Sequence, residues 1–224
     1  MEDDRPPGPQ ASGLARDEPL VAQSAPHRPV SAPAPRTIKL MLVSGSGRSG
    51  STNAAVLRTA ASLTPDGVEA EMFNEVGELP LFNPDDDREG QPTDPRVAAM
   101  RQAVAAADGL LICTPEYAGA LPAALKNLLE WTIGDAGTYD MPVGWINAAG
   151  VASPNGTADA HESLRKVLQY AGADIAEDVC VRVPVLRQMV DARGQIADPQ
   201  ARDAIEASVA RLARHVRQRN QNRC

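Results

Sequence analysis

The chain has 224 residues, 43% of them hydrophobic, and a formal net charge of -7, as expected of a soluble globular protein with one sizeable core. Because the acidic balance repels phosphate backbones, we expect no nucleic-acid partner. No apolar run is long enough to span a bilayer and no secretory signal begins the chain, so we expect no membrane contact and a cytoplasmic location. The three cysteines and three histidines are scattered, which predicts reduced thiols and no metal site.

The first 36 residues differ in character from the rest of the chain. They contain many prolines, which are interleaved with Ala, Ser, Arg and Asp. They show neither a helical nor an alternating apolar period. We expect a disordered, solvated extension over residues 1–36, with a docking motif as the less favoured alternative. An apolar run at residues 38–43 is typical of a buried strand, so one folded domain is expected over residues 37–224.

Strand-like and helix-like segments alternate through that domain. Strands are expected at residues 38–43, 68–73, 109–113, 143–147 and 179–183, and helices at 53–63, 95–107, 121–133, 158–170 and 199–217. This alternation predicts an α/β fold with a five-stranded parallel sheet in the order 2-1-3-4-5 and helices on both faces. In such a sheet the ligand crevice lies at the carboxyl ends of strands one and three.

The loop after the first strand, residues 44–53, has the composition of a phosphate site. Its glycines allow a close approach of the backbone, and the following helix turns free N–H groups and its positive end toward an anion. Ser46, Ser51 and Thr52 add hydroxyl groups, and Arg48 adds a charged fork. We expect the loop to bind a phosphate monoester, and a flexible Gly/Ser turn is the alternative.

The same loop also satisfies the dinucleotide pattern G-x-G-x-x-G through Gly45, Gly47 and Gly50. Glu69 or Glu71 follows at about the distance at which that motif places a ribose-binding carboxylate. Against this interpretation, an arginine and many hydroxyl groups suit a terminal phosphate better than a pyrophosphate. The two glutamates also alternate with apolar residues, as on the exposed face of an edge strand. A Rossmann NAD-dependent dehydrogenase remains the less favoured alternative.

The loop after the third strand, residues 114–122, suits a planar heterocycle. Pro115 stiffens the exit from the strand, Gly119 permits close backbone approach, and Tyr117 has a flat face with a hydroxyl group. An ordinary strand-to-helix turn is the alternative. A third polar loop, at residues 147–156, either wraps the far edge of the heterocycle or is a plain turn.

With these loops, the chain resembles the NADPH-dependent FMN reductase family, which includes chromate, quinone and azo-dye reductases. The resemblance covers about residues 38–185. Its matching pieces are residues 45–48 with Ser51 and Asn53, residues 79–83, residues 114–117, residues 125–127 and Trp131. It implies a flavodoxin-like fold and, with it, a homodimer or homotetramer with the flavin near the subunit interface.

The resemblance also implies the residues that hold FMN. The phosphate-binding set is Ser46, Arg48, Ser51 and Asn53, to which the hydroxyl of Thr52 adds a donor. The isoalloxazine is expected against Pro115, Glu116, Tyr117 and Ala118. Ala118 stands where many relatives have Asn or His, so one polar contact near the flavin or the substrate is absent.

The implied activity is transfer of hydride from NADPH or NADH, through FMN, to a small-molecule acceptor such as a quinone, an azo dye, a metal oxyanion or a free flavin. The cofactor performs this chemistry, so no side chain is expected to act as an acid or base. A non-enzymatic FMN electron carrier is the main alternative, because it would bind the same cofactor without steady oxidation of NAD(P)H.

Overall fold

The computed structural model describes residues 36–88, 93–150 and 157–223, which belong to one unit, Pro35–Cys224. Apart from Arg36, the extension expected to be disordered lies outside the described residues. The same holds for residues 151–156 of the third polar loop. No helix within the described ranges is both long and apolar enough to cross a lipid bilayer.

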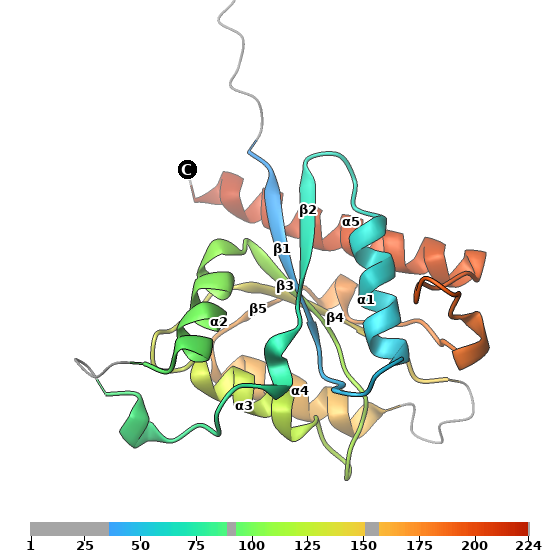
Figure 1. The fold of residues 1–224 in the computed structure, drawn as a ribbon. Coiled ribbons are helices and arrows are strands. Elements are labelled where there is room, and N and C mark those ends of the chain that lie inside the picture. Colours follow the sequence, from blue (N-terminus) through green and yellow to red (C-terminus); the bar gives the residue numbers. More distant parts are fainter. Residues whose placement is uncertain (1–35, 89–92, 151–156, 224) are drawn as a thin grey trace, which may run out of the picture. The chain divides into compact units, whose positions relative to one another are not determined.

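The described residues form a six-stranded sheet in which every strand pair is parallel (Figure 1). Its strands are β1 (Ile38–Ser44), β2 (Val68–Phe73), β3 (Gly109–Cys113), β4 (Pro142–Asn147), β5 (Asp174–Ile175) and β6 (Val181–Arg182). The order β2-β1-β3-β4-β5, with β6 also paired to β4, confirms the predicted order 2-1-3-4-5. Strand β3 is buried along its whole length, as expected of a parallel sheet covered on both faces.

The predicted fifth strand at residues 179–183 is confirmed only for Val181–Arg182, because Val179 lies in a 3-10 turn and a further short strand precedes it. Two short strands, β5 and β6, pair with opposite ends of β4, and a 3-10 turn, η3 (Glu177–Val179), separates them. The reason is the packing of Val179 on Gly144 in the middle of β4: a Cβ built on Gly144 would lie 2.6 Å from the Cβ of Val179. The chain leaves the sheet for one turn and so buries the Val179 side chain completely.

Helices cover both faces of the sheet and form two separate apolar cores. One core lies between the sheet and helices α1 (Thr52–Ser62) and α5 (Pro199–Asn222). The other contains residues of α2 (Pro95–Ala106), α3 (Ala123–Trp131) and α4 (Ala158–Tyr170). The short 3-10 turns η1 (Glu75–Gly77), η2 (Pro84–Asp86) and η4 (Arg187–Met189) lie in the connections.

The ends of two helices differ from expectation. Helix α3 begins after its N-cap residue Pro122, and it is shorter than the predicted 121–133 because the chain turns after Trp131. Helix α5 extends beyond the predicted residue 217, to Asn222. The additional residues of α5 are polar and lie beyond the apolar stripe that predicted the helix.

Helix α4 packs a histidine on the sheet. His161 is only 8% exposed, and its ring stacks on that of Trp145 in β4, with 6.0 Å between the ring centroids. Neither ring nitrogen has a hydrogen-bond partner within the described part of the chain. Burial lowers the pKa of His161 from its ordinary 6.5 to about 4. The side chain is therefore neutral at physiological pH.

This burial predicts a pH-dependent stability. Because the pKa of His161 is lower in the folded than in the unfolded chain, its contribution is complete above about pH 6.5 and is lost as the pH falls toward 4. At pH 5 the loss from this group amounts to about 2 kcal/mol. The substitution His161→Phe keeps a flat ring on Trp145 and removes the titrating group. The free energy of unfolding is measured in urea at pH 7.5 and at pH 5.0. Between the two, the wild type should lose more of it than the variant does, by the amount given above for His161. Equal losses would contradict the lowered pKa.

Candidate functional site

The two predicted loops meet where β1 and β3 end, side by side in the sheet (Figure 1). The N–H of Gly45 donates to the carbonyl of Cys113 at 3.0 Å. A Cβ built on Gly45 would lie 2.1 Å from Oγ1 and 2.7 Å from Cβ of Thr114, a fully buried and stiff β-branched residue. Position 45 therefore requires glycine, and its close contact with Thr114 joins the two loops.

The first loop presents a set of unpaired backbone donors. No described residue accepts a hydrogen bond from the N–H groups of Gly47 and of residues 49–53. These groups lie in the loop and the first turn of α1, where the positive end of the helix dipole adds to them. Free N–H groups at a helix N-terminus are the arrangement that binds phosphate, so the residues present fit the phosphate of FMN.

Three predicted side chains of this loop have distinct positions. The hydroxyl of Ser51 caps α1 by accepting from the N–H of Ala54 at 3.5 Å, and Ser46 accepts from the N–H of Arg48 at 3.4 Å. Arg48 itself is exposed, and its guanidinium makes no hydrogen bond or ion pair with any described residue. Arg48 is thus a free cation beside the free N–H groups.

The other two predicted residues of the loop lie deeper. Thr52 begins α1 and is half-buried. Asn53 is buried, and its Oδ1 accepts a hydrogen bond from the thiol of Cys113 at 3.3 Å. Burial raises the pKa of the Cys113 thiol, which keeps it protonated and able to donate. In this structure the Asn53 side chain therefore connects α1 to the end of β3.

The second loop is a tight turn with an exposed aromatic ring. Tyr117 and Ala120 exchange two backbone hydrogen bonds, of 3.0 and 3.1 Å, around Ala118 and Gly119, which both have positive φ angles of 52° and 72°. Asn tolerates this left-handed conformation better than Ala does, so the departure at Ala118 concerns the backbone as well as a polar contact. Tyr117 is 43% exposed and Pro115 half-buried. The turn thus presents the flat face of Tyr117 at the surface.

Glu116, between them, is engaged elsewhere. Its Oε2 accepts a hydrogen bond from the N–H of Ala160, in the first turn of α4, at 3.2 Å. Helix α4 lacks a side-chain cap of its own, because the hydroxyl of Thr157 donates to Oδ1 of Asn147 at 2.8 Å. The carboxylate of Glu116 thus supplies a distant cap and links the second loop to α4.

The motif residues of α3 hold a third segment in place. Oδ1 of Asn127 accepts from the N–H of Phe82 at 2.7 Å, and its amide group donates to the carbonyl of Pro80 at 2.9 Å. Trp131 donates to the same carbonyl at 2.8 Å. Lys126, in contrast, lies on the surface and pairs with Glu130. Asn127 therefore orders the segment at residues 79–83, while Lys126 belongs to a solvated helix face.

A second cation, not predicted from the sequence, lies beside the first loop. Arg187, in η4, lies so close to Gly50 that a Cβ built there would be 3.6 Å from its Nη2 atom. No motif indicates this proximity, because the two residues are far apart in the sequence.

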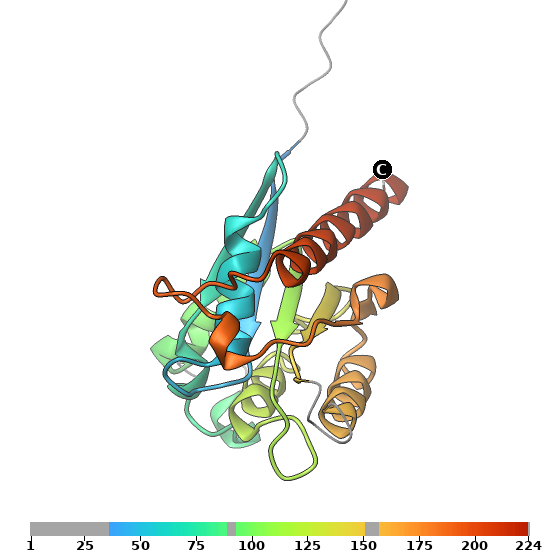
Figure 2. The ribbon, with the colours of Figure 1, turned by 90° about the vertical axis from the view of Figure 1, so that its right-hand side faces the viewer.

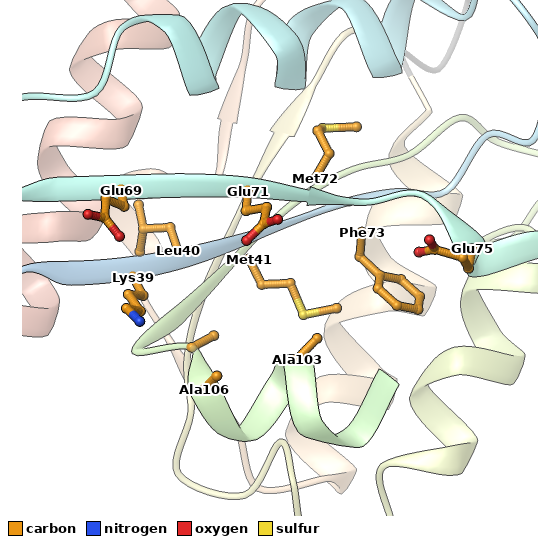
Figure 3. A pocket seen from close by; sticks show the side chains of 11 residues that line it. Lys39, Leu40, Met41, Glu69, Glu71, Met72, Phe73, Glu75, Ala103 and Ala106 are labelled. Carbon is orange, nitrogen blue, oxygen red and sulfur yellow. The ribbon is translucent and has the colours of Figure 1, made fainter. Parts of the chain in front are cut away.

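A groove at the free edge of the sheet is lined in part by the two glutamates of the dinucleotide alternative. It has a volume of about 330 Å³ and lies between β2, β1 and α2, with Glu69, Glu71 and Lys39 among its lining residues (Figure 3). The hollow beside the first loop, of about 100 Å³, has neither glutamate in its lining. Glu69 and Glu71 thus form the exposed acidic face of an edge strand, which weakens the Rossmann alternative.

Comparisons with known proteins agree with this geometry. The model of the family described as NADPH-dependent FMN reductase matches residues 38–184. An NAD(P)H-dependent FMN reductase of Pseudomonas aeruginosa is 34% identical over 182 residues, which cover 80% of this chain and 96% of that protein. A 2-hydroxy-1,4-benzoquinone reductase of a Burkholderia species is 33% identical over 185 residues, which cover 81% of this chain and 98% of that protein.

The fold is shared with a solved flavoenzyme, the NAD(P)H:(acceptor) oxidoreductase FerB of Paracoccus denitrificans. Its TM-score is 0.63 at 20% sequence identity, and the similarity covers 80% of this chain and 98% of that one. This likeness confirms the flavodoxin-like arrangement of sheet and helices. The family match, which spans most of the chain, shows more: the chain belongs to the NADPH-dependent FMN reductase family.

Proposed function

We propose that this protein is an FMN-dependent oxidoreductase that passes hydride from NADPH or NADH to a small-molecule acceptor. The observation that carries the proposal is the first loop, where unpaired N–H groups at the start of α1 lie beside the free guanidinium of Arg48. An unsatisfied set of donors and a cation favour a dianionic terminal phosphate, and FMN has one. Membership of the family supports the same cofactor.

The chain would position FMN rather than take part in the bond changes. Bound FMN supplies the ring that accepts and returns the electrons. Residues Ser46, Arg48, Ser51, Thr52 and Asn53 would surround its phosphate. The turn at Pro115–Ala118 would lie along its ring, and the paired hydrogen bonds of Tyr117 and Ala120 make this turn rigid before any ligand arrives.

The acceptor is proposed to be a quinone, with azo dyes, metal oxyanions and free flavin as further members of the same reactive class. The quinone reductase of the Burkholderia species, similar over nearly its whole length, supports this choice. Tyr117 is exposed at the turn and offers a flat surface on which a planar acceptor can stack.

An absorption spectrum with and without NADPH tests the proposal. The purified protein, supplied with FMN, should show a bound-flavin spectrum that bleaches when NADPH or NADH is added without air and returns when benzoquinone is added. A protein that ignores FMN would overturn the proposal. A protein that binds FMN but does not oxidise either nucleotide would instead be the non-enzymatic electron carrier.

Arg48 should contribute specifically to binding the phosphate. The substitution Arg48→Ala removes a charge-assisted contact, and we expect FMN binding to weaken about ten- to a hundredfold. Riboflavin, which lacks the phosphate, should bind equally well to both proteins in a fluorescence titration. Equal losses for the two flavins would indicate damage to the loop, and no loss for FMN would show that N–H and hydroxyl groups hold the phosphate without Arg48.

We further propose a homodimer or homotetramer in the cytoplasm. Two large apolar side chains are exposed, Leu81 by 82% and Ile133 by 44%, and a second copy would cover them. The free thiols Cys113 and Cys180 suit a reducing compartment. Light scattering should give the mass of two or four chains, and cell fractionation should recover the protein with cytoplasmic markers. A mass of one chain, or recovery elsewhere, would contradict the respective proposal.

A further inference from the structure

The segment that follows β6 is attached to α1 by hydrogen bonds. The N–H of Ile196 donates to the buried hydroxyl of Thr59 at 2.8 Å, and Nε of Arg58 donates to the carbonyl of Gly194 at 3.0 Å. The segment folds back on itself, because the N–H of Ala197 donates to the carbonyl of Met189 at 2.8 Å. Figure 2 shows it beside α1. These bonds fix η4, at the start of the segment, relative to α1.

As a result, Arg187 of η4 lies at the N-terminus of α1. A Cβ built on Gly50 would lie 3.6 Å from Nη2 of Arg187, and Gly50 directly precedes the N-cap residue Ser51. Among the described residues, no carboxylate pairs with Arg187, and its guanidinium donates no hydrogen bond. Arg187 is exposed, and its guanidinium lies unpaired near Gly50, in the loop that carries the free N–H groups and leads into α1.

This arrangement gathers positive charge at one end of α1. The N-terminus of α1 carries a partial positive charge, and Arg187 and Arg48 add two full ones near the same loop. Like charges that are brought together without a counter-ion repel one another, whereas an anion bound between them would satisfy all three. A phosphate monoester carries nearly two negative charges at neutral pH and matches two arginines.

We propose that Arg187 is a second phosphate-binding residue. It would contact the phosphate of FMN from a segment that is distant in the sequence from the first loop. This inference rests on the proposed function. The 2′-phosphate of NADPH has the same chemistry, but the position of Arg187 at the start of α1, beside the free N–H groups, assigns it to FMN.

The test compares flavin binding in the purified apoprotein by fluorescence titration. We expect Arg187→Ala to weaken FMN binding about tenfold and to change riboflavin binding by less than about twofold. Arg187→Lys should recover part of the loss, because it keeps the charge and loses the fork. The matched control is Arg193→Ala, in the same segment: this side chain is 82% exposed and pairs with Asp191, so FMN binding should not change.

The outcomes separate the possible roles. Equal losses of FMN and riboflavin binding would indicate damage to the fold and would overturn the assignment. No loss of binding for either flavin would indicate that Arg187 is solvated, which would overturn it as well. A raised KM for NADPH but not for NADH, with FMN binding intact, would move Arg187 to the nucleotide phosphate and also overturn it. If the wild type bound neither flavin, the proposed function itself would fail, which is distinct from a wild type that binds FMN independently of Arg187.

Discussion

The candidate site depends on the parallel pairing of β1 with β3. Their register, from Leu40 opposite Gly109 to Ser44 opposite Cys113, ends both strands at the same level of the sheet. The next residues, Gly45 and Thr114, then come into contact so close that no side chain fits at position 45. Two loops that are distant in the sequence become one surface, with the N-terminus of α1 on one side and the turn at Tyr117 on the other.

Polar contacts over long sequence distances hold this surface in shape. Glu116 caps α4, Asn53 accepts from the thiol of Cys113, and Asn127 fastens the segment at residues 79–83. These contacts do not involve the N–H groups of Gly47 and of residues 49–53, which stay unpaired within the described residues. Unpaired N–H groups at a helix N-terminus and a cation without a counter-charge favour an anion, so their presence in one loop is consistent with the proposed phosphate site.

The strand order followed from patterns in single segments, and the phosphate site is proposed from patterns of the same kind. Alternating apolar and helical segments predicted the order 2-1-3-4-5, and glycines with hydroxyl groups before a helix predicted the phosphate loop. The predicted fifth strand was too long, because Val179 at its start is apolar for another reason than strand formation. Val179 packs on Gly144, and a turn rather than a strand brings it there.

The sequence by itself thus determined the sheet order and the places of the two loops after β1 and β3, since these depend on residues close to one another along the chain. Only the tertiary structure decided where side chains meet across the fold. It directed Glu116 to α4 and brought Arg187 to Gly50. Such contacts depend on how a late segment crosses α1, and the hydrogen bonds from Ile196 to Thr59 and from Arg58 to Gly194 that set this crossing leave no periodic pattern in the sequence.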